Sequence, residues 1–355
     1  MQKHIPQLNA VRGVAILLVL AHNLHAFSAP PLGSVSSFGW MGVDLFFVLS
    51  GFLITGILLD TKPSQSYFRN FYARRALRIW PLYYSVLLIM FVFVPLVRPQ
   101  NAAEIFQRSD PWWSYPFFLQ NFFVTDPSRS VGALGVSWSL AVEELFYLIW
   151  PAFVRLLSTR QLQAVAWSGV LASPFLRLFF VSRGWLIYSN PFCRVDGLMA
   201  GALLAVLVRK SSFTPSRWIV PAWIAVLLPG PLAIVAELHN VRWLTFSFDT
   251  LAFAGFLYLA VFSGSTWLKA CLTNRFLTFS GTISYGLYLL HKLPQDVLKT
   301  RPFYWAHPHL AFLAALVLSY LIAFASWSLL EEPLLRLKRF FESPVPSTES
   351  PTLSL

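Results

Sequence analysis

Long apolar runs alternate along this chain with short segments that hold most of its charged residues. A bilayer core is about 30 Å thick, so a spanning helix needs about 20 apolar residues. Asp249 interrupts one run, and another, at 195–208, is short. The pattern predicts an all-α integral membrane protein with about ten transmembrane helices. We expect them near residues 10–27, 39–59, 79–97, 139–157, 163–182, 195–208, 217–235, 243–263, 276–292 and 309–330.

Composition strengthens this prediction. Of the 355 residues, 56% are hydrophobic and only 12% are charged, whereas soluble domains carry about 25% charged residues. The net charge of +12 is concentrated in the segments between apolar runs. Anionic lipid headgroups, rather than nucleic acid, are therefore the partner expected for these cations.

The distribution of Lys and Arg predicts the orientation. An even number of spans puts both termini on one side, and most of the 27 Lys and Arg residues fall on that side. We therefore expect a multi-pass protein of the plasma (inner) membrane with cytoplasmic termini. One transmembrane domain is predicted over 1–342, followed by a disordered Ser/Pro/Thr-rich tail over 343–355.

The first apolar run contains ionisable residues. Arg12 opens it, and His22 follows roughly 15 Å further along a helix, near the bilayer midplane. A second imidazole, His25, ends the run. Ionisable groups at this depth are costly and mark functional sites, so we read an uncleaved first span with a catalytic role. The alternative is a neutral histidine hydrogen-bonded between helices.

The sequence contains no motif that indicates a bound metal ion or a permanently bound cofactor. Cys193 and Cys271 are far apart and show no metal-ligand spacing. The common nucleotide-binding, metalloprotease and hydrolase motifs are absent from the sequence. We predict no metal site and no permanently bound cofactor.

Four segments together resemble acyltransferase family 3, the multi-span O-acyltransferases that modify envelope glycans, lipids and secondary metabolites. They are RGVAILLVLAH at 12–22, GWMGVDLFFVLSGFLIT at 39–55, FYARRALRIWPLYY at 71–84 and SWSLAVEELFYLIWP at 137–151. In the last segment Leu145 replaces the glutamine usual in the family. Weaker similarities follow at 194–201, 283–291 and 331–336.

The resemblance implies transfer of an acyl group, with acetyl expected, from acyl-CoA to a hydroxyl group. The acceptor would be a sugar, polysaccharide, lipid-linked precursor or secondary metabolite. Guanidinium groups bind phosphate bidentately, so Arg12, Arg75 and Arg78 are the candidates for binding the phosphates of the donor. Anchoring of membrane topology is the alternative for Arg75 and Arg78.

The resemblance also makes His22 the candidate general base or transient acyl carrier, since imidazole exchanges protons near neutral pH. One spacing departs from the family pattern: nine residues, rather than ten, separate Arg12 from His22, and Asn23 occupies the usual position. An offset of ten leaves the two side chains about 80° apart around a helix. Either a helix irregularity such as a π-bulge re-aims His22, or His25 or an altered mechanism replaces it.

Carboxylates supply the remaining candidates. Glu143 and Glu144 open the fourth span, where the helix dipole favours negative charge. Two successive residues face different directions, so one is expected to face the interior and to orient a histidine, pair with an arginine or bind the acceptor. Asp44 lies in an apolar span and needs a partner, either Arg194 or Arg12.

Two alternatives remain. A transporter or flippase would use Asp44, Glu143 and His22 as a proton relay, although no internal repeat of the kind many transporters have is present. A catalytically degenerate family member, acting as a sensor or assembly subunit, is favoured by the nine-residue spacing and by Leu145.

Overall fold

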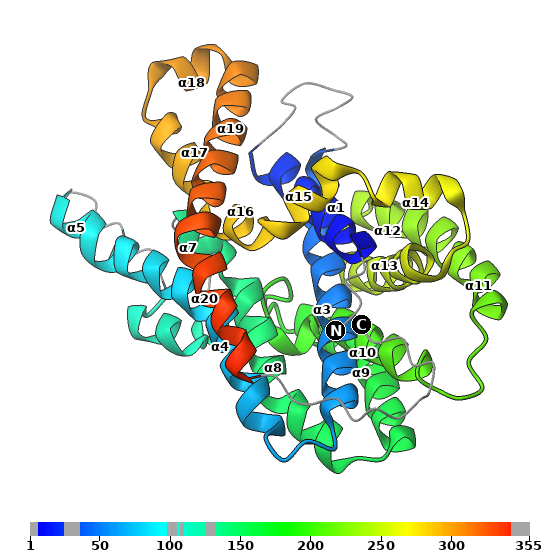
Figure 1. The fold of residues 1–355 in the computed structure, drawn as a ribbon. Coiled ribbons are helices and arrows are strands. Elements are labelled where there is room, and N and C mark those ends of the chain that lie inside the picture. The colour runs from blue at the N-terminus through cyan, green and yellow to red at the C-terminus, as the bar shows by residue number, and fades with distance from the viewer. Residues whose placement is uncertain are drawn as a thin grey trace.

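The computed structural model describes residues 6–24, 36–97, 99, 105–106, 110–124 and 132–341. Every regular element within these ranges is helical, as Figure 1 shows, which confirms the all-α prediction. His25 and the predicted tail at 343–355 lie outside the described residues.

Seven helical segments of the described chain are long and apolar enough to cross a membrane. They are Phe38–Thr61, Tyr67–Val97, Ala133–Leu156, Thr159–Ser182, Pro215–Leu238, Arg242–Phe262 and Pro308–Phe341. Two further expected spans are helical but less suited to crossing alone. Helix α10 (Val195–Leu207) has 13 residues, and α1 (Pro6–Asn23) has polar residues at both ends.

The expected span at 276–292 is wrong as a single helix. The chain forms three short helices there, α15 (Arg275–Thr282), α16 (Ser284–Leu290) and α17 (Lys292–Lys299). The first break follows a Ser-Gly-Thr sequence, whose residues are weak helix formers. A run of apolar residues predicts that a segment is buried, but it does not predict where the helix within that segment ends.

Helix α3 (Gly42–Thr61), which follows the short turn η1 (Phe38–Met41), lies at the centre of the bundle. In an apolar 18-residue stretch of Phe38–Thr61, 72% is buried, whereas only 11% of such a stretch is buried in Pro215–Leu238. It contacts α1 on one side and α10 on another. A Cβ atom at Gly51 would lie 1.9 Å from Leu198 O, so α3 and α10 pack backbone against backbone.

Helix α1 is held in the same way by α15 and α3 (Figure 1). A Cβ atom at Gly281 would lie 1.7 Å from Asn9 O, and one at Gly42 would lie 2.4 Å from Ala15 O. Only glycine permits these approaches. The position of Arg12 relative to α3 is therefore fixed by the backbone.

Buried ion pairs join α3, α9 (Thr159–Ser182) and α10. Arg194 Nη2 lies 2.7 Å from Asp44 Oδ1, and Arg177 Nη1 lies 2.8 Å from Asp196 Oδ2. The predicted need of Asp44 for a partner is confirmed, and the partner is Arg194.

The remaining elements enclose this centre. Helix α4 (Tyr67–Leu88) continues through the π-helical turn η2 (Ile89–Phe93) into α5 (Val94–Val97). Helix α8 (Trp138–Leu156) follows α7 (Gly132–Val136). The other helices are α11 (Pro215–Leu227), α12 (Pro229–Leu238), α13 (Arg242–Phe262), α14 (Thr266–Leu272), α18 (Pro302–Ala306), α19 (Pro308–Ser326) and α20 (Glu332–Arg336). Short helical turns complete the described chain at Trp112–Phe117, Gln120–Phe122, Pro191–Cys193, Trp327–Glu331 and Leu337–Phe341.

Candidate active site

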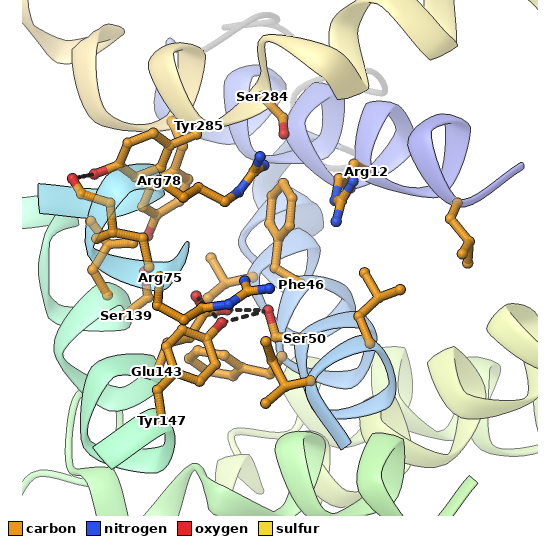
Figure 2. Close-up of a pocket in the computed structure, with 18 of the residues that line it drawn as sticks. Arg12, Phe46, Ser50, Arg75, Arg78, Ser139, Glu143, Tyr147, Ser284 and Tyr285 are labelled. Atoms are coloured by element: carbon orange, nitrogen blue, oxygen red, sulfur yellow. Dashed lines mark hydrogen bonds between the residues drawn. The ribbon is translucent and has the colours of Figure 1, made fainter. Parts of the chain in front are cut away.

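A cavity of about 340 Å³ lies among α1, α3, α4, α8 and α16. Its wall is apolar in large part but includes charged and hydroxyl groups from all five helices (Figure 2). The polar lining residues are Asn9, Arg12, Ser50, Arg75, Arg78, Ser139, Glu143, Tyr147, Ser284, Tyr285 and Tyr288.

The three arginines predicted to bind the donor line this one cavity. Arg12 comes from α1, and its Nη1 donates a hydrogen bond to Asn9 Oδ1 at 2.9 Å. Arg75 and Arg78 come from α4, where a spacing of three residues puts them on the same face. Figure 2 shows their guanidinium groups directed toward the space between the helices.

These guanidinium groups have no carboxylate partner. Among the described residues, the ion pairs involve other cations, such as Arg194 and Arg209, and none includes Arg12, Arg75 or Arg78. The Arg75 guanidinium instead lies 5.8 Å from the ring centroid of Tyr147. Three guanidinium groups outnumber Glu143, the carboxylate in the cavity lining, and an excess of positive charge favours binding of an anion.

Glu143 belongs to a compact hydrogen-bonded group. Ser50 donates to Glu143 Oε1 at 2.7 Å, and Tyr147 donates to Glu143 Oε2 at 3.0 Å. The hydroxyls of Tyr147 and Ser50 are 3.2 Å apart. Figure 2 shows these three side chains together on one side of the cavity.

Glu144 faces elsewhere and does not line the cavity. Trp80 Nε1 lies 3.5 Å from Glu144 Oε2 at a partly exposed position on α4. The expectation that the two successive carboxylates face different directions is confirmed, and Glu143 is the one directed toward the cavity.

His22 is not brought to the cavity. Its Nδ1 lies 3.3 Å from Ser36 O. Helix α1 is regular from Pro6 to Asn23, so the irregularity considered as a means of re-aiming His22 is absent. Arg12 and His22 therefore remain roughly 15 Å apart along the axis and about 80° apart around it.

Ser50 and Tyr147 are the polar neighbours that the sequence reasoning missed. Tyr147 lies four residues after Glu143 on α8, a spacing that places both on one helix face. That signal was readable in the sequence. Ser50 had no comparable signal, because its partner is on another helix and 93 residues away.

The described residues contain no group of three or more His, Cys, Asp or Glu side chains that could hold a metal ion. The side chains that line the cavity have chemical capacities of their own. Three guanidinium groups can hold an anion, a carboxylate can accept a proton, and a hydroxyl bonded to that carboxylate can give one up.

Known proteins similar to this chain include acyltransferases. A family model described as an acyltransferase domain matches residues 5–328. The chain is 27% identical to the peptidoglycan O-acetyltransferase OatA of Listeria monocytogenes, covering 94% of this chain and 56% of that protein. It is 28% identical to the putative peptidoglycan O-acetyltransferase YrhL of Bacillus subtilis, with 94% and 55% covered.

A putative O-acetyltransferase of Staphylococcus aureus is 28% identical, with 81% of this chain and 50% of that protein covered. The chain thus spans about half the length of the curated relatives it matches. No solved structure matches the chain. Because the family model covers nearly the whole helical bundle, including every helix that lines the cavity, the chain belongs to this acyltransferase family.

Proposed function

We propose that this protein transfers an acyl group, acetyl in the first instance, from acyl-CoA to a hydroxyl of an envelope glycan at the plasma membrane. The observation that carries the proposal is the convergence of Arg12, Arg75 and Arg78 on a cavity that also contains Glu143. The glycan acceptor is suggested by two relatives, which are named for O-acetylation of peptidoglycan.

The charge of the cavity suits the donor. Acyl-CoA carries several phosphate charges, and guanidinium groups bind phosphate in a bidentate manner. At about 340 Å³ the cavity is near the lower end of ligand pockets, which run from about 300 to 1,000 Å³. It therefore suits the acyl-pantetheine end of the donor, with the phosphates held by the arginines.

The acyl-transfer step needs a base for the hydroxyl proton and positive charge for the developing oxyanion. Glu143 is the base available inside the cavity, and Arg75 supplies the positive charge beside it. His22 lies beyond the cavity along α1, so we assign it to binding the acceptor at a distance from the hydroxyl that is acylated. With cytoplasmic termini, Arg12 is on the side from which acyl-CoA arrives.

The transporter alternative is less well supported. A proton relay through Asp44, Glu143 and His22 needs these groups to be connected. Asp44 is instead engaged by Arg194 in a buried ion pair, and neither Asp44 nor His22 lines the cavity that contains Glu143.

The test uses the full chain in lipid nanodiscs with isotope-labelled acetyl-CoA and soluble peptidoglycan fragments. We expect release of free CoA and a label on acceptor hydroxyls. A matched control is Arg336→Ala, because Arg336 is exposed and pairs with Glu332 on its own helix. Tight binding of acetyl-CoA without release of CoA would instead favour the degenerate family member, and no dependence on acyl-CoA would overturn the donor assignment.

A further inference from the structure

We propose that Ser50 is the nucleophile that takes the acyl group from the donor thioester, with Glu143 as its general base. This inference rests on the proposed function, because it requires acyl-CoA as the donor. It adds a covalent acyl-serine intermediate and divides the reaction into two transfers at one carboxylate.

The first support is the contact itself. Ser50 Oγ lies 2.7 Å from Glu143 Oε1, and both side chains line the cavity. A nucleophile and a base within hydrogen-bonding distance, with the base oriented by a third group, is the arrangement typical of covalent catalysis. Tyr147 is that third group, since it donates to the other carboxylate oxygen at 3.0 Å.

The second support is that the Ser50 hydroxyl does not bond to its own helix, as the hydroxyls of several other helical serines do. A helical serine commonly donates to the carbonyl four residues earlier. Ser85, Ser173 and Ser319 do so, with hydrogen bonds of 2.8, 2.7 and 2.7 Å. Ser50 instead donates to α8 across the bundle. Its hydroxyl is thereby held at the cavity wall rather than against its own backbone.

The third support is the positive charge of Arg75 beside this hydrogen-bonded group. The Arg75 guanidinium lies over the Tyr147 ring and lines the same cavity. Attack on a thioester places negative charge on the carbonyl oxygen, and a fixed positive group stabilises that charge. Arg75 is the cavity arginine with a contact to this hydrogen-bonded group.

The step balances without any further reactant. Ser50 Oγ bonds to the acyl carbon, the bond from that carbon to the CoA sulfur breaks, and the Ser50 proton passes to Glu143 and then to the departing thiolate. In the second transfer the acceptor oxygen bonds to the acyl carbon and the bond from that carbon to Ser50 Oγ breaks. The acceptor proton passes to Glu143 and back to Ser50.

The position of Ser50 along its helix suits an intermediate shared between two substrates. Ser50 is eight residues after Gly42, about 12 Å into a helix of 20 residues. The acyl group would therefore rest near the middle of the span. CoA is free to leave before the acceptor arrives.

The experiment traps the intermediate in the full chain. Wild type, Ser50→Ala and the control Ser319→Ala are incubated in nanodiscs with isotope-labelled acetyl-CoA and no acceptor, quenched in acid, digested and analysed by mass spectrometry. Ser319 is a buried serine that donates to Ala315 O on its own helix, so its replacement controls for loss of a hydroxyl. Release of CoA and acylation of added acceptor are measured in parallel.

We expect the peptide containing Ser50 to gain the mass of one acetyl group in wild type and in Ser319→Ala, and to lose it when acceptor is added. Ser50→Ala should lack this mass and should lose most CoA release, whereas Ser50→Cys should recover an acylated peptide. Acylation of acceptor by Ser50→Ala at the wild-type rate would overturn the nucleophile but leave the proposed function intact. Absence of CoA release in wild type would overturn both.

Discussion

Ser50 and Glu143 form a hydrogen bond of 2.7 Å that joins α3 to α8 inside a cavity lined by three arginines. The bond puts a proton donor and its acceptor where an anionic donor molecule would bind.

Replacing Glu143 by Gln keeps the size of the side chain and removes the base. General-base catalysis contributes roughly 10²- to 10⁴-fold, so we expect acyl transfer to fall within that range. Glu144→Gln is the matched comparison, because Glu144 does not line the cavity and should lose far less. Rates of CoA release from purified variants measure the effect, and equal losses in both variants would contradict the assignment.

Removing a cavity arginine should weaken donor binding more than it slows the chemistry. Hydrogen bonds to charged groups contribute roughly 1.5–3 kcal/mol, so Arg78→Ala should raise KM for acetyl-CoA by roughly ten- to a hundredfold. Arg78→Lys should recover only part of this loss, because lysine lacks the planar fork. Steady-state kinetics with varied acetyl-CoA decide the matter, and an unchanged KM would remove Arg78 from the donor site.

Replacing His22 by Ala should separate the two transfers. His22 lies outside the cavity, so acylation of the enzyme by acetyl-CoA should persist while transfer to the acceptor falls. Intact-protein mass spectrometry and acceptor labelling report the two steps. Loss of the acyl-enzyme in this variant would instead place His22 in the donor half of the reaction.

The buried pair between Asp44 and Arg194 should matter for stability. Both side chains are almost completely enclosed, at 2% and 1% exposed. Removing one partner of a buried pair costs about 3–5 kcal/mol, so Asp44→Ala should strongly lower the thermal unfolding temperature in nanodiscs. Glu332→Ala breaks an exposed pair with Arg336 and should cost at most about 1 kcal/mol.

The tight contact at Gly281 should also be sensitive to size. A Cβ atom there would lie 1.7 Å from Asn9 O, so Gly281→Ala must push α15 away from α1. We expect lower thermal stability and weaker acetyl-CoA binding, since Arg12 moves with α1. Gly264→Ala is a suitable control, because an added Cβ there meets nothing within 4 Å. Equal stability of the two variants would contradict the packing argument.

Much of the candidate site followed from the sequence. Arg12 could be chosen because charges in apolar helices are costly and need a function or a partner, and Arg75, Arg78 and Glu143 because they lie in the segments that resemble the family. The pairing of Asp44 was predicted from the same cost of a charge in an apolar helix. The approximate angle between Arg12 and His22 also followed, since it depends only on regular helix geometry.

Other features depended on the packing of helices that are distant in sequence. Ser50 could not be selected because nothing in the sequence fixes which face of α3 meets α8. The break in the span expected at 276–292 was missed because hydropathy predicts burial and not helix ends. Helix α15 ends next to Gly281, which packs closely against Asn9. The sequence identified His22 as an ionisable residue in an apolar run. Its distance from the cavity could not be predicted, because it depends on how α3 packs against α1.

Helix α1 has a further consequence for substrate size. Gly39 packs against Leu18 and His22 of α1. Ser50 follows Gly39 by roughly 16 Å along the helical segment that includes α3. The glycine contacts hold α1 against α3 and so fix the distance between His22 and Ser50. An acceptor that touches His22 and also reaches Ser50 must be at least as long as this distance. A glycan chain of several sugar units is long enough. A single free sugar is too short to bind at His22 and be acylated from Ser50 at the same time.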